Sequence, residues 1–145
     1  MKRNSMINVA AICALLLITA ACEPAKKAPA LAFIPFSESA AADVQSEGKP
    51  AVVYATADWC PSCVQFNNGL LADTKIREEL KNFTMLKIDY THKDAETAAT
   101  LASLEIDALP TLVIYDRDGK ESRRIVGSTN RPFFIASLRG ASEKK

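Results

Sequence analysis

Two cysteines three residues apart, Cys60 and Cys63, stand between a short apolar run and a segment with helical spacing. The apolar run, residues 51–56, reads AVVYAT and is rich in β-forming residues, as expected for a buried strand. Pro61 fits the first turn of the following helix, because its missing N–H would have no partner there in any case. The cysteines therefore lie at a strand-to-helix turn, which predicts an α/β fold.

Such a pair has three physical uses: half of a metal site, a structural staple, or a dithiol that opens and closes during a reaction. A structural zinc site needs four ligands, usually Cys and His. Beyond the pair, the chain after Cys22 offers only His92. As a staple the pair closes a very short loop, which would stabilise a fold by only about 2 kcal/mol. We therefore expect no metal site and favour a reactive dithiol.

The position of the pair supplies a mechanism for exchange. Cys60 lies at the predicted start of a helix, where unpaired N–H groups and the positive end of the helix dipole favour a thiolate. Cys63, one turn further on, lies on the same helix face and within reach of Cys60. Cys63 can therefore attack a mixed disulfide formed at Cys60 and release the partner.

The rest of the chain alternates between predicted strands and helices. Pro35 has no backbone N–H to donate to a neighbouring strand, so its strand is expected at a sheet edge. A break is predicted at Asn67–Gly69, within the helical segment that follows the cysteines. Strands are predicted at 31–36, 51–56, 83–90 and 111–116, and a turn at 116–119 leads into a hairpin partner at 120–126. Helices are predicted at 37–48, 61–82, 94–106 and 131–140, the last with Phe133, Phe134 and Leu138 facing inward.

Strands that alternate with helices give a largely parallel sheet covered on both faces, and the last two strands form an antiparallel hairpin. The predicted fold class is therefore α/β, with a central mixed β-sheet flanked by helices on both faces. One domain is expected over residues 31–140, followed by a C-terminal tail at 141–145.

Several motifs carry a resemblance to a known family. WCPSC after a strand, LPT (109–111) before a later strand, and Gly127 after the closing hairpin strand resemble the thioredoxin fold. The segments ADWCPSC, KIDYTHKD, LPTLVIYDRDGKE and RIVG are similar to the C-terminal periplasmic domain of the thiol:disulfide interchange protein DsbD and to small thioredoxin-like lipoproteins. The resemblance covers about residues 31–140.

This resemblance implies reversible dithiol–disulfide exchange. Cys60 would be the attacking sulfur, Cys63 the resolving sulfur, and Pro110 a cis proline facing them. The redox-active disulfide Cys60–Cys63 would act without any other cofactor. The expected partners are protein thiols and disulfides, together with an upstream membrane electron donor, because the sequence has neither the membrane domain nor the N-terminal domain of DsbD.

Two positions depart from the thioredoxin pattern. Thioredoxins usually place a buried Asp six residues before the first cysteine, where this chain has Tyr54. That replacement removes a candidate proton acceptor for the resolving thiol. The dipeptide between the cysteines is Pro61-Ser62 and not the Gly-Pro of thioredoxin. The resemblance therefore does not predict the reduction potential of the pair.

Four further residues are candidates for supporting or docking roles. Trp59 precedes the attacking cysteine at a surface turn, and we predict that it forms part of a docking face. Asp58 is either a solvated loop charge or a group that tunes Cys60. Pro110 in the LPT motif is predicted to follow a cis bond beside the cysteines, and Thr111 belongs to the same motif.

The first 21 residues read as a secretory signal. Lys2 and Arg3 precede an uncharged stretch whose strongly apolar part, 9–21, is short for a bilayer span. LLLITAAC resembles the lipobox of bacterial lipoproteins, which predicts that Cys22 is lipidated and becomes the new N-terminus. Residues 22–30 are then the lipidated N-terminus and a linker.

This reading places the domain outside the cytoplasm, facing the periplasm and held to a membrane by lipid. Glu23 follows Cys22, where aspartate would resemble an inner-membrane retention signal. The outer membrane is therefore favoured if the host is Gram-negative. Removing Lys2 and Arg3 from the 18 basic residues leaves 16 against 17 acidic ones, a formal net charge of −1, so no basic surface for nucleic acid is expected.

The sequence therefore predicts a monomeric, lipid-anchored thiol–disulfide oxidoreductase, acting as a reductant or as a relay of disulfide exchange. The preference for reduction depends on the likeness to DsbD alone. A disulfide oxidase or isomerase is the alternative within the enzyme class. A lipoprotein that uses the fold as a binding or chaperone module is the alternative outside it.

Overall fold

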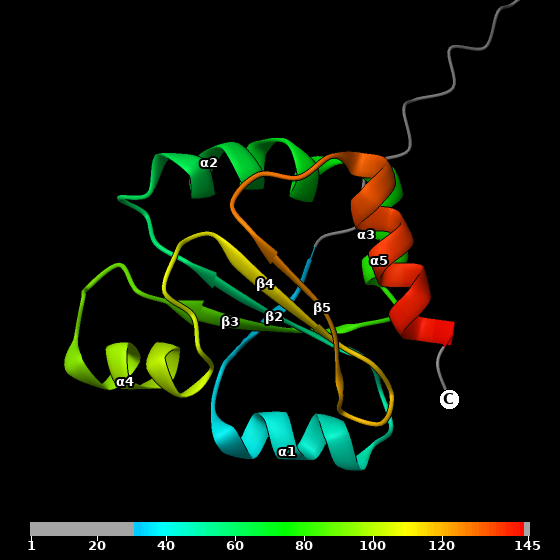
Figure 1. The fold of residues 1–145 in the computed structure, drawn as a ribbon, viewed down its shortest axis with the longest axis horizontal. Coiled ribbons are helices and arrows are strands. Elements are labelled where there is room, and N and C mark those ends of the chain that lie inside the picture. Colours follow the sequence, from blue (N-terminus) through cyan, green and yellow to red (C-terminus); the bar gives the residue numbers. More distant parts are fainter. Residues whose placement is uncertain (1–30, 144–145) are drawn as a thin grey trace, which may run out of the picture.

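The computed structural model describes residues 31–143, which form a five-stranded mixed sheet with helices on both faces (Figure 1). The predicted fold class is confirmed. The predicted signal at 1–21, the lipidation site Cys22, the linker at 22–30 and the last residues of the tail lie outside the described residues. Within 31–143 no helix is long and apolar enough to cross a membrane.

The strand order across the sheet is β1-β3-β2-β4-β5. The central strand β2 pairs in parallel with β3 and antiparallel with β4, and β1 and β5 form the edges. Pro35 lies in the edge strand β1, as its missing N–H predicts. The strands are β1 (Phe33–Pro35), β2 (Ala51–Thr56), β3 (Thr84–Asp89), β4 (Thr111–Tyr115) and β5 (Glu121–Val126).

Side-chain caps start most of the helices. The Ser37 hydroxyl accepts a hydrogen bond from the N–H of Ala40, and Asp73 and Asp94 cap two later helices in the same way. The helical segment after the cysteines breaks at Gly69, as predicted. The helices are α1 (Glu38–Ser46), α2 (Pro61–Asn68), the short 3₁₀ helix η2 (Leu70–Ala72), α3 (Thr74–Leu80), α4 (Ala95–Ser103) and α5 (Arg131–Glu143).

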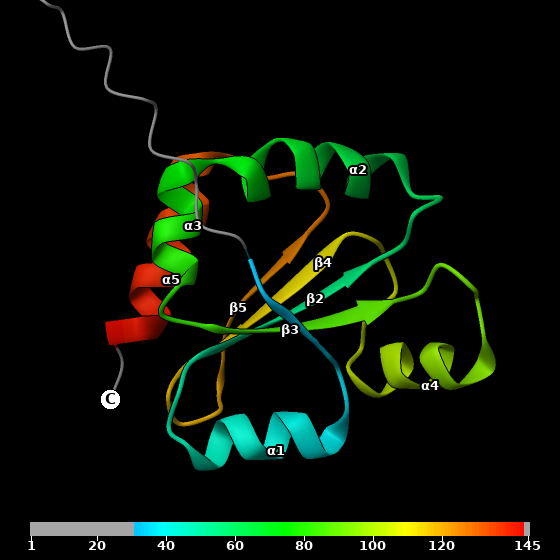
Figure 2. The same ribbon diagram turned by 180° about the vertical axis from the view of Figure 1, so that it is seen from behind.

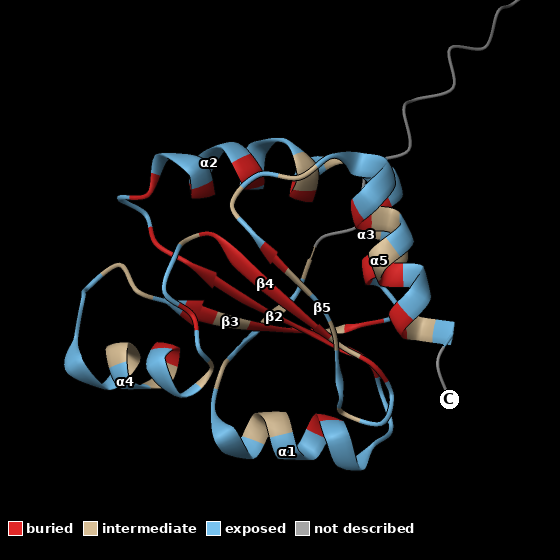
Figure 3. Cartoon of the chain, in the orientation of Figure 1, coloured by how far each residue is buried: buried red, intermediate tan, exposed pale blue. Residues whose placement is uncertain are grey.

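The sheet separates two hydrophobic cores. On one face α2, α3 and α5 pack on side chains such as Tyr54 and Leu112, and on the other face α1 and α4 cover Val53 and Val113 (Figure 2). All six residues of β2 are buried, whereas most residues of the edge strands and of the outer helix faces are exposed or half-buried (Figure 3). β2 is therefore the rigid centre from which the cysteines project.

The last helix differs from its prediction in two ways. It continues to Glu143, past the predicted end at Gly140, because Ala141 is fully buried against the core. Phe133 does not face inward: it is 45% exposed, and its ring lies beneath the Arg123 guanidinium. Adjacent helical positions point about 100° apart, so Phe133 and the fully buried Phe134 cannot both enter the core.

The described chain begins near the end of the sheet at which the parallel strands β1, β2 and β3 start. Phe33 in β1 pairs with Met85, near the start of β3. β2 and β3 end together at the pair Thr56 and Asp89, and the cysteines follow that end. The first described residues and the cysteines therefore lie toward opposite ends of the parallel strands.

Candidate active site

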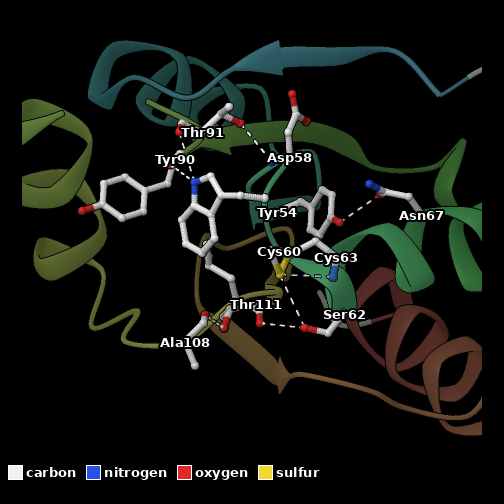
Figure 4. Close-up of a disulfide and its surroundings, with 12 residues drawn as sticks. Tyr54, Asp58, Cys60, Ser62, Cys63, Asn67, Tyr90, Thr91, Ala108 and Thr111 are labelled. Carbon is white, nitrogen blue, oxygen red and sulfur yellow. Dashed lines mark hydrogen bonds between the residues drawn. A yellow bond between two sulfur atoms is a disulfide. The ribbon is translucent and has the colours of Figure 1, made fainter. Parts of the chain in front are cut away.

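Cys60 and Cys63 form a disulfide at the start of α2, with their Cα atoms 5.2 Å apart (Figure 4). Cys60 is the N-cap residue of the helix and Pro61 follows at its first position. Cys60 is 5% exposed, whereas Cys63 is fully buried beneath the helix start. Of the two sulfurs, Cys60 is therefore the one that solvent or a partner reaches first.

The start of α2 is arranged to stabilise negative charge on the Cys60 sulfur. The N–H of Cys63 donates to Cys60 Sγ over 3.2 Å. This bond takes the place that a serine or aspartate oxygen fills at an ordinary N-cap. The same donor and the positive end of the helix dipole favour the thiolate when the disulfide is opened.

Pro110 lies on the loop that faces the disulfide, and the Leu109–Pro110 bond is cis, as predicted. The N–H of Gly127 donates to the Pro110 carbonyl over 2.8 Å. Thr111 is 1% exposed, and its hydroxyl donates to the Ala108 carbonyl over 2.7 Å. Thr111 therefore supports the shape of this loop and is not available as a docking residue.

Trp59 is a fixed side chain on the surface beside Cys60. The residue is 48% exposed, and its indole N–H donates to the carbonyls of Tyr90 and Thr91 over 3.2 and 3.1 Å. The Tyr90 ring meets it edge-on, and Lys93 Nζ lies 4.3 Å from its ring centroid. An exposed aromatic ring held in this way can contact a partner without losing side-chain entropy.

The loop that holds Trp59 is itself organised by Asp89. The Asp89 carboxylate accepts hydrogen bonds from the N–H and the hydroxyl of Thr91. It also forms an ion pair with Lys87. The Thr91 hydroxyl oxygen in turn accepts from the N–H of Asp58. The carboxylate of Asp58 is exposed and has no partner within residues 31–143. The structure thus gives Asp58 a main-chain role in the loop.

The pKa of Asp89 reflects this network. Burial acts to raise the pKa of the carboxyl, but hydrogen bonds from Lys87 and Thr91, together with the Lys87 charge, outweigh it and lower the pKa to about 2. Asp89 and Thr91 both lie in the KIDYTHKD segment, but neither was assigned a role from the sequence. A short Asp-x-Thr motif that begins at the last residue of a strand is a local signal that could have found them.

Asp89→Asn is expected to reduce the acid sensitivity of the fold. A pKa lowered on folding means that ionised Asp89 stabilises the protein above its unfolded pKa, near 4, and that this stabilisation disappears as pH falls from about 4 to 2. Because the side chain is 43% exposed, we expect a contribution of about 1 kcal/mol or less. Urea unfolding of the wild type and of Asp89→Asn at pH 7, 4 and 2.5 measures this contribution to the free energy of unfolding.

Asp43→Asn is the control, since the Asp43 carboxylate has no hydrogen bond or ion pair within the described residues. The wild type and Asp43→Asn should lose more stability than Asp89→Asn between pH 4 and 2.5. Equal losses in all three proteins would contradict the role given to Asp89.

An open groove with a volume of about 730 Å³ begins at the disulfide and runs along α4. Its walls are largely apolar, and Glu105 and Asp107 are the charged residues that line it. Its other walls include Trp59, Cys60, Tyr90, Leu101, Ile106 and Leu109. Cys60 therefore lies where an extended segment of another protein could reach it.

Tyr54, at the position of the usual acid, is a buried neutral group. It is 1% exposed, its ring stacks on Phe66, and its hydroxyl donates to Asn67 Oδ1 over 2.9 Å. Burial raises the pKa of the phenol, with hydrogen bonds to Thr56 and Asn67 acting in the opposite direction. Tyr54 therefore joins β2 to α2 one turn beyond Cys63. The role of Asn67 was not foreseen from the sequence.

The described residues contain no group of three or more His, Cys, Asp or Glu side chains placed to hold a metal ion. His92 is exposed on the loop after Tyr90. Cys60 and Cys63 bond to each other, so the chemistry that this geometry offers is the opening and closing of one disulfide.

Comparison with known proteins agrees with this geometry. The family model of the thioredoxin-like domain matches residues 37–142. Thiol:disulfide interchange protein DsbD of Yersinia enterocolitica is 34% identical over 100 residues, which cover 68% of this chain and 17% of that protein. The chain therefore spans only a small part of the length of this relative.

Two solved structures share the fold. One is a DsbH oxidoreductase, with a TM-score of 0.65 and 19% identity, over 79% of this chain and 86% of that chain. The other is the C-terminal domain of DsbD from Neisseria meningitidis in its oxidised form, with a TM-score of 0.59 and 23% identity, over 75% and 100% of the two chains. At these identities the likeness shows the fold alone.

Proposed function

Because the chain belongs to the family of thioredoxin-like domains, we propose that it is an extracytoplasmic thiol–disulfide oxidoreductase that reduces disulfides in other proteins or relays disulfide exchange. The observation that carries the proposal is the Cys60–Cys63 disulfide at the N-terminus of α2, open to a groove on the Cys60 side. The pair acts in a monomer, without another cofactor.

In the reducing direction the cycle starts from the dithiol. The Cys60 thiolate attacks one sulfur of a client disulfide, and the other client sulfur leaves as a thiolate. Cys63 then loses its proton and attacks Cys60 Sγ, which releases the second client sulfur. The client gains two electrons and takes up two protons, and the Cys60–Cys63 disulfide is formed again. A dithiol donor, which we take to be a membrane protein, returns the two electrons.

The reduction potential of the Cys60–Cys63 pair tests whether the protein reduces or oxidises its client proteins. Reductants of this fold lie near about −270 mV and strong oxidants near about −120 mV. The likeness to DsbD supports a value toward the first. Equilibration with glutathione or dithiothreitol, followed by separation of the alkylated forms, gives the potential. A value near the second would support the oxidase or isomerase alternative and contradict the reducing role.

Anchoring through Cys22 is the second part of the proposal. It is supported by the small residues before Cys22 and by the short apolar segment that precedes them. We expect labelled fatty acid to enter the wild type and to be absent from Cys22→Ala when both are expressed in a bacterium. Cys13→Ala is the control and should keep the label. Label that persists in Cys22→Ala would contradict the assignment.

The host compartment is inferred in the same way. A signal of this kind and the likeness to a periplasmic domain support a periplasm-facing location, and Glu23 favours the outer membrane in a Gram-negative host. Fractionation of inner and outer membranes tests this placement.

A further inference from the structure

The Ser62 hydroxyl lies between the reactive sulfur and the loop opposite it (Figure 4). Its Oγ is 3.4 Å from Cys60 Sγ and 3.4 Å from the Leu109 carbonyl oxygen. Ser62 is exposed at the second position of α2, and Leu109 lines the groove. The hydroxyl has one proton, so it can donate to only one of these two acceptors at a time.

The redox state determines which acceptor is the better one. A disulfide sulfur is neutral and accepts hydrogen bonds weakly, so in the oxidised protein the proton lies toward the Leu109 carbonyl. A separation of 3.4 Å is long for O–H···O, whose usual range is about 2.5–3.0 Å, so this bond is weak. Sulfur is a larger atom than oxygen, and 3.4 Å is an ordinary distance for a hydroxyl that donates to it.

We propose that Ser62 is a positioning residue whose hydroxyl moves from the Leu109 carbonyl to the Cys60 thiolate when the disulfide is reduced. This inference rests on the proposed function. A dithiol donor supplies two electrons and becomes a disulfide, and the Cys60–Cys63 bond breaks. One of the donor's two protons remains on Cys63 as a thiol, the other goes to solvent, and Cys60 remains as the thiolate.

The thiolate then has two donors, the N–H of Cys63 at 3.2 Å and the Ser62 hydroxyl. Hydrogen bonds to an ionised group are stronger than those between neutral groups. The move also frees the carbonyl of Leu109, a residue that lines the groove, to accept a hydrogen bond from an N–H of a bound protein segment. The form that attacks a client disulfide is therefore the form in which this acceptor is open.

Alkylation of the reduced protein with iodoacetamide between pH 4 and 9 tests the proposal, since only the thiolate reacts. Ser62→Ala should shift the midpoint of the pH profile upward by about 0.5 to 1 pH unit, because one of the two donors is lost while solvent replaces part of its effect. The equilibrium with glutathione should shift about three- to tenfold toward the disulfide, a potential lower by about 15–30 mV.

Two variants separate this role from a general effect on the helix. Ser62→Thr keeps the hydroxyl and should retain the wild-type midpoint. Ser39→Ala is the matched control, because Ser39 holds the same second position in α1 and is also exposed, but within residues 31–143 its hydroxyl bonds to Ser37 and not to a sulfur. It should change neither the midpoint nor the potential.

An unchanged midpoint in Ser62→Ala would overturn the inference, and so would a midpoint in Ser62→Thr that moves as far as in Ser62→Ala. The alkylation profile needs no client protein. It therefore remains informative if the wild type fails to exchange with any disulfide substrate, a result that would contradict the proposed function instead.

Discussion

Cys63→Ala is expected to accumulate covalent adducts with its client proteins, and Cys60→Ala is expected to lose disulfide exchange by about 10³-fold or more. In the wild type a mixed disulfide at Cys60 is short-lived, because Cys63 is held one helical turn away at a very high effective concentration. Without Cys63 the adduct has no internal attacking group. Without Cys60 the remaining thiol is fully buried and cannot reach a client.

The measurement is a non-reducing gel of membranes from cells that express each variant, repeated after reduction. The double variant Cys60→Ala, Cys63→Ala is the matched background, and Cys60→Ala should show few adducts or none. Mass spectrometry of the trapped proteins would give the clients. If Cys63→Ala shows no reducible adducts above the double variant, the exchange mechanism loses its main support and a binding or chaperone role is favoured.

Tyr54→Asp, which restores the residue usual in thioredoxins, is expected to destabilise this protein by about 4 kcal/mol or more. Tyr54 is 1% exposed and its ring contacts Phe33 and Phe66. Replacing it by a smaller side chain leaves a cavity, which costs about 3–5 kcal/mol for a large aromatic residue. A carboxylate in the same place also loses its hydration without gaining a cation.

Tyr54→Phe is the matched control. It keeps the ring contacts and loses only the hydrogen bond to Asn67, which we expect to cost about 1 kcal/mol. Urea unfolding of both oxidised variants at pH 7 gives the two values. If Tyr54→Asp is as stable as Tyr54→Phe, this part of the core tolerates an acid, and the packing argument for Tyr54 is wrong.

The sequence predicted the parts of the site that depend on neighbouring residues. Cys60 caps a helix because a strand, a proline and a helical segment follow one another within a few residues, and these are local signals. The fold class follows from the same alternation along the chain. Pro110 was predicted from a motif, and the structure places it on the loop facing the disulfide.

Contacts between distant segments could not be predicted in this way. The bonds from Trp59 to the Tyr90 and Thr91 carbonyls join residues about thirty positions apart, and they depend on how β3 ends beside β2. The approach of Ser62 to Leu109 likewise needs the loop before β4 to face the start of α2.

The prediction that Phe133 faces the core was wrong for a different reason. Hydrophobicity alone does not say which of two adjacent aromatic residues a helix buries. The choice depends on the rotation of α5 against the sheet, and in this protein the core takes Phe134.

The placement of β1 has a consequence for how the domain would face a bilayer. The chain enters where the parallel strands begin, and Cys60 lies beyond the end where they finish. Residues 23–30 span at most about 30 Å when fully extended. Anchored at Cys22, the domain would therefore be held close to the lipid by the end remote from its reactive sulfur. Cys60 would point away from the membrane, toward proteins that approach from the aqueous space.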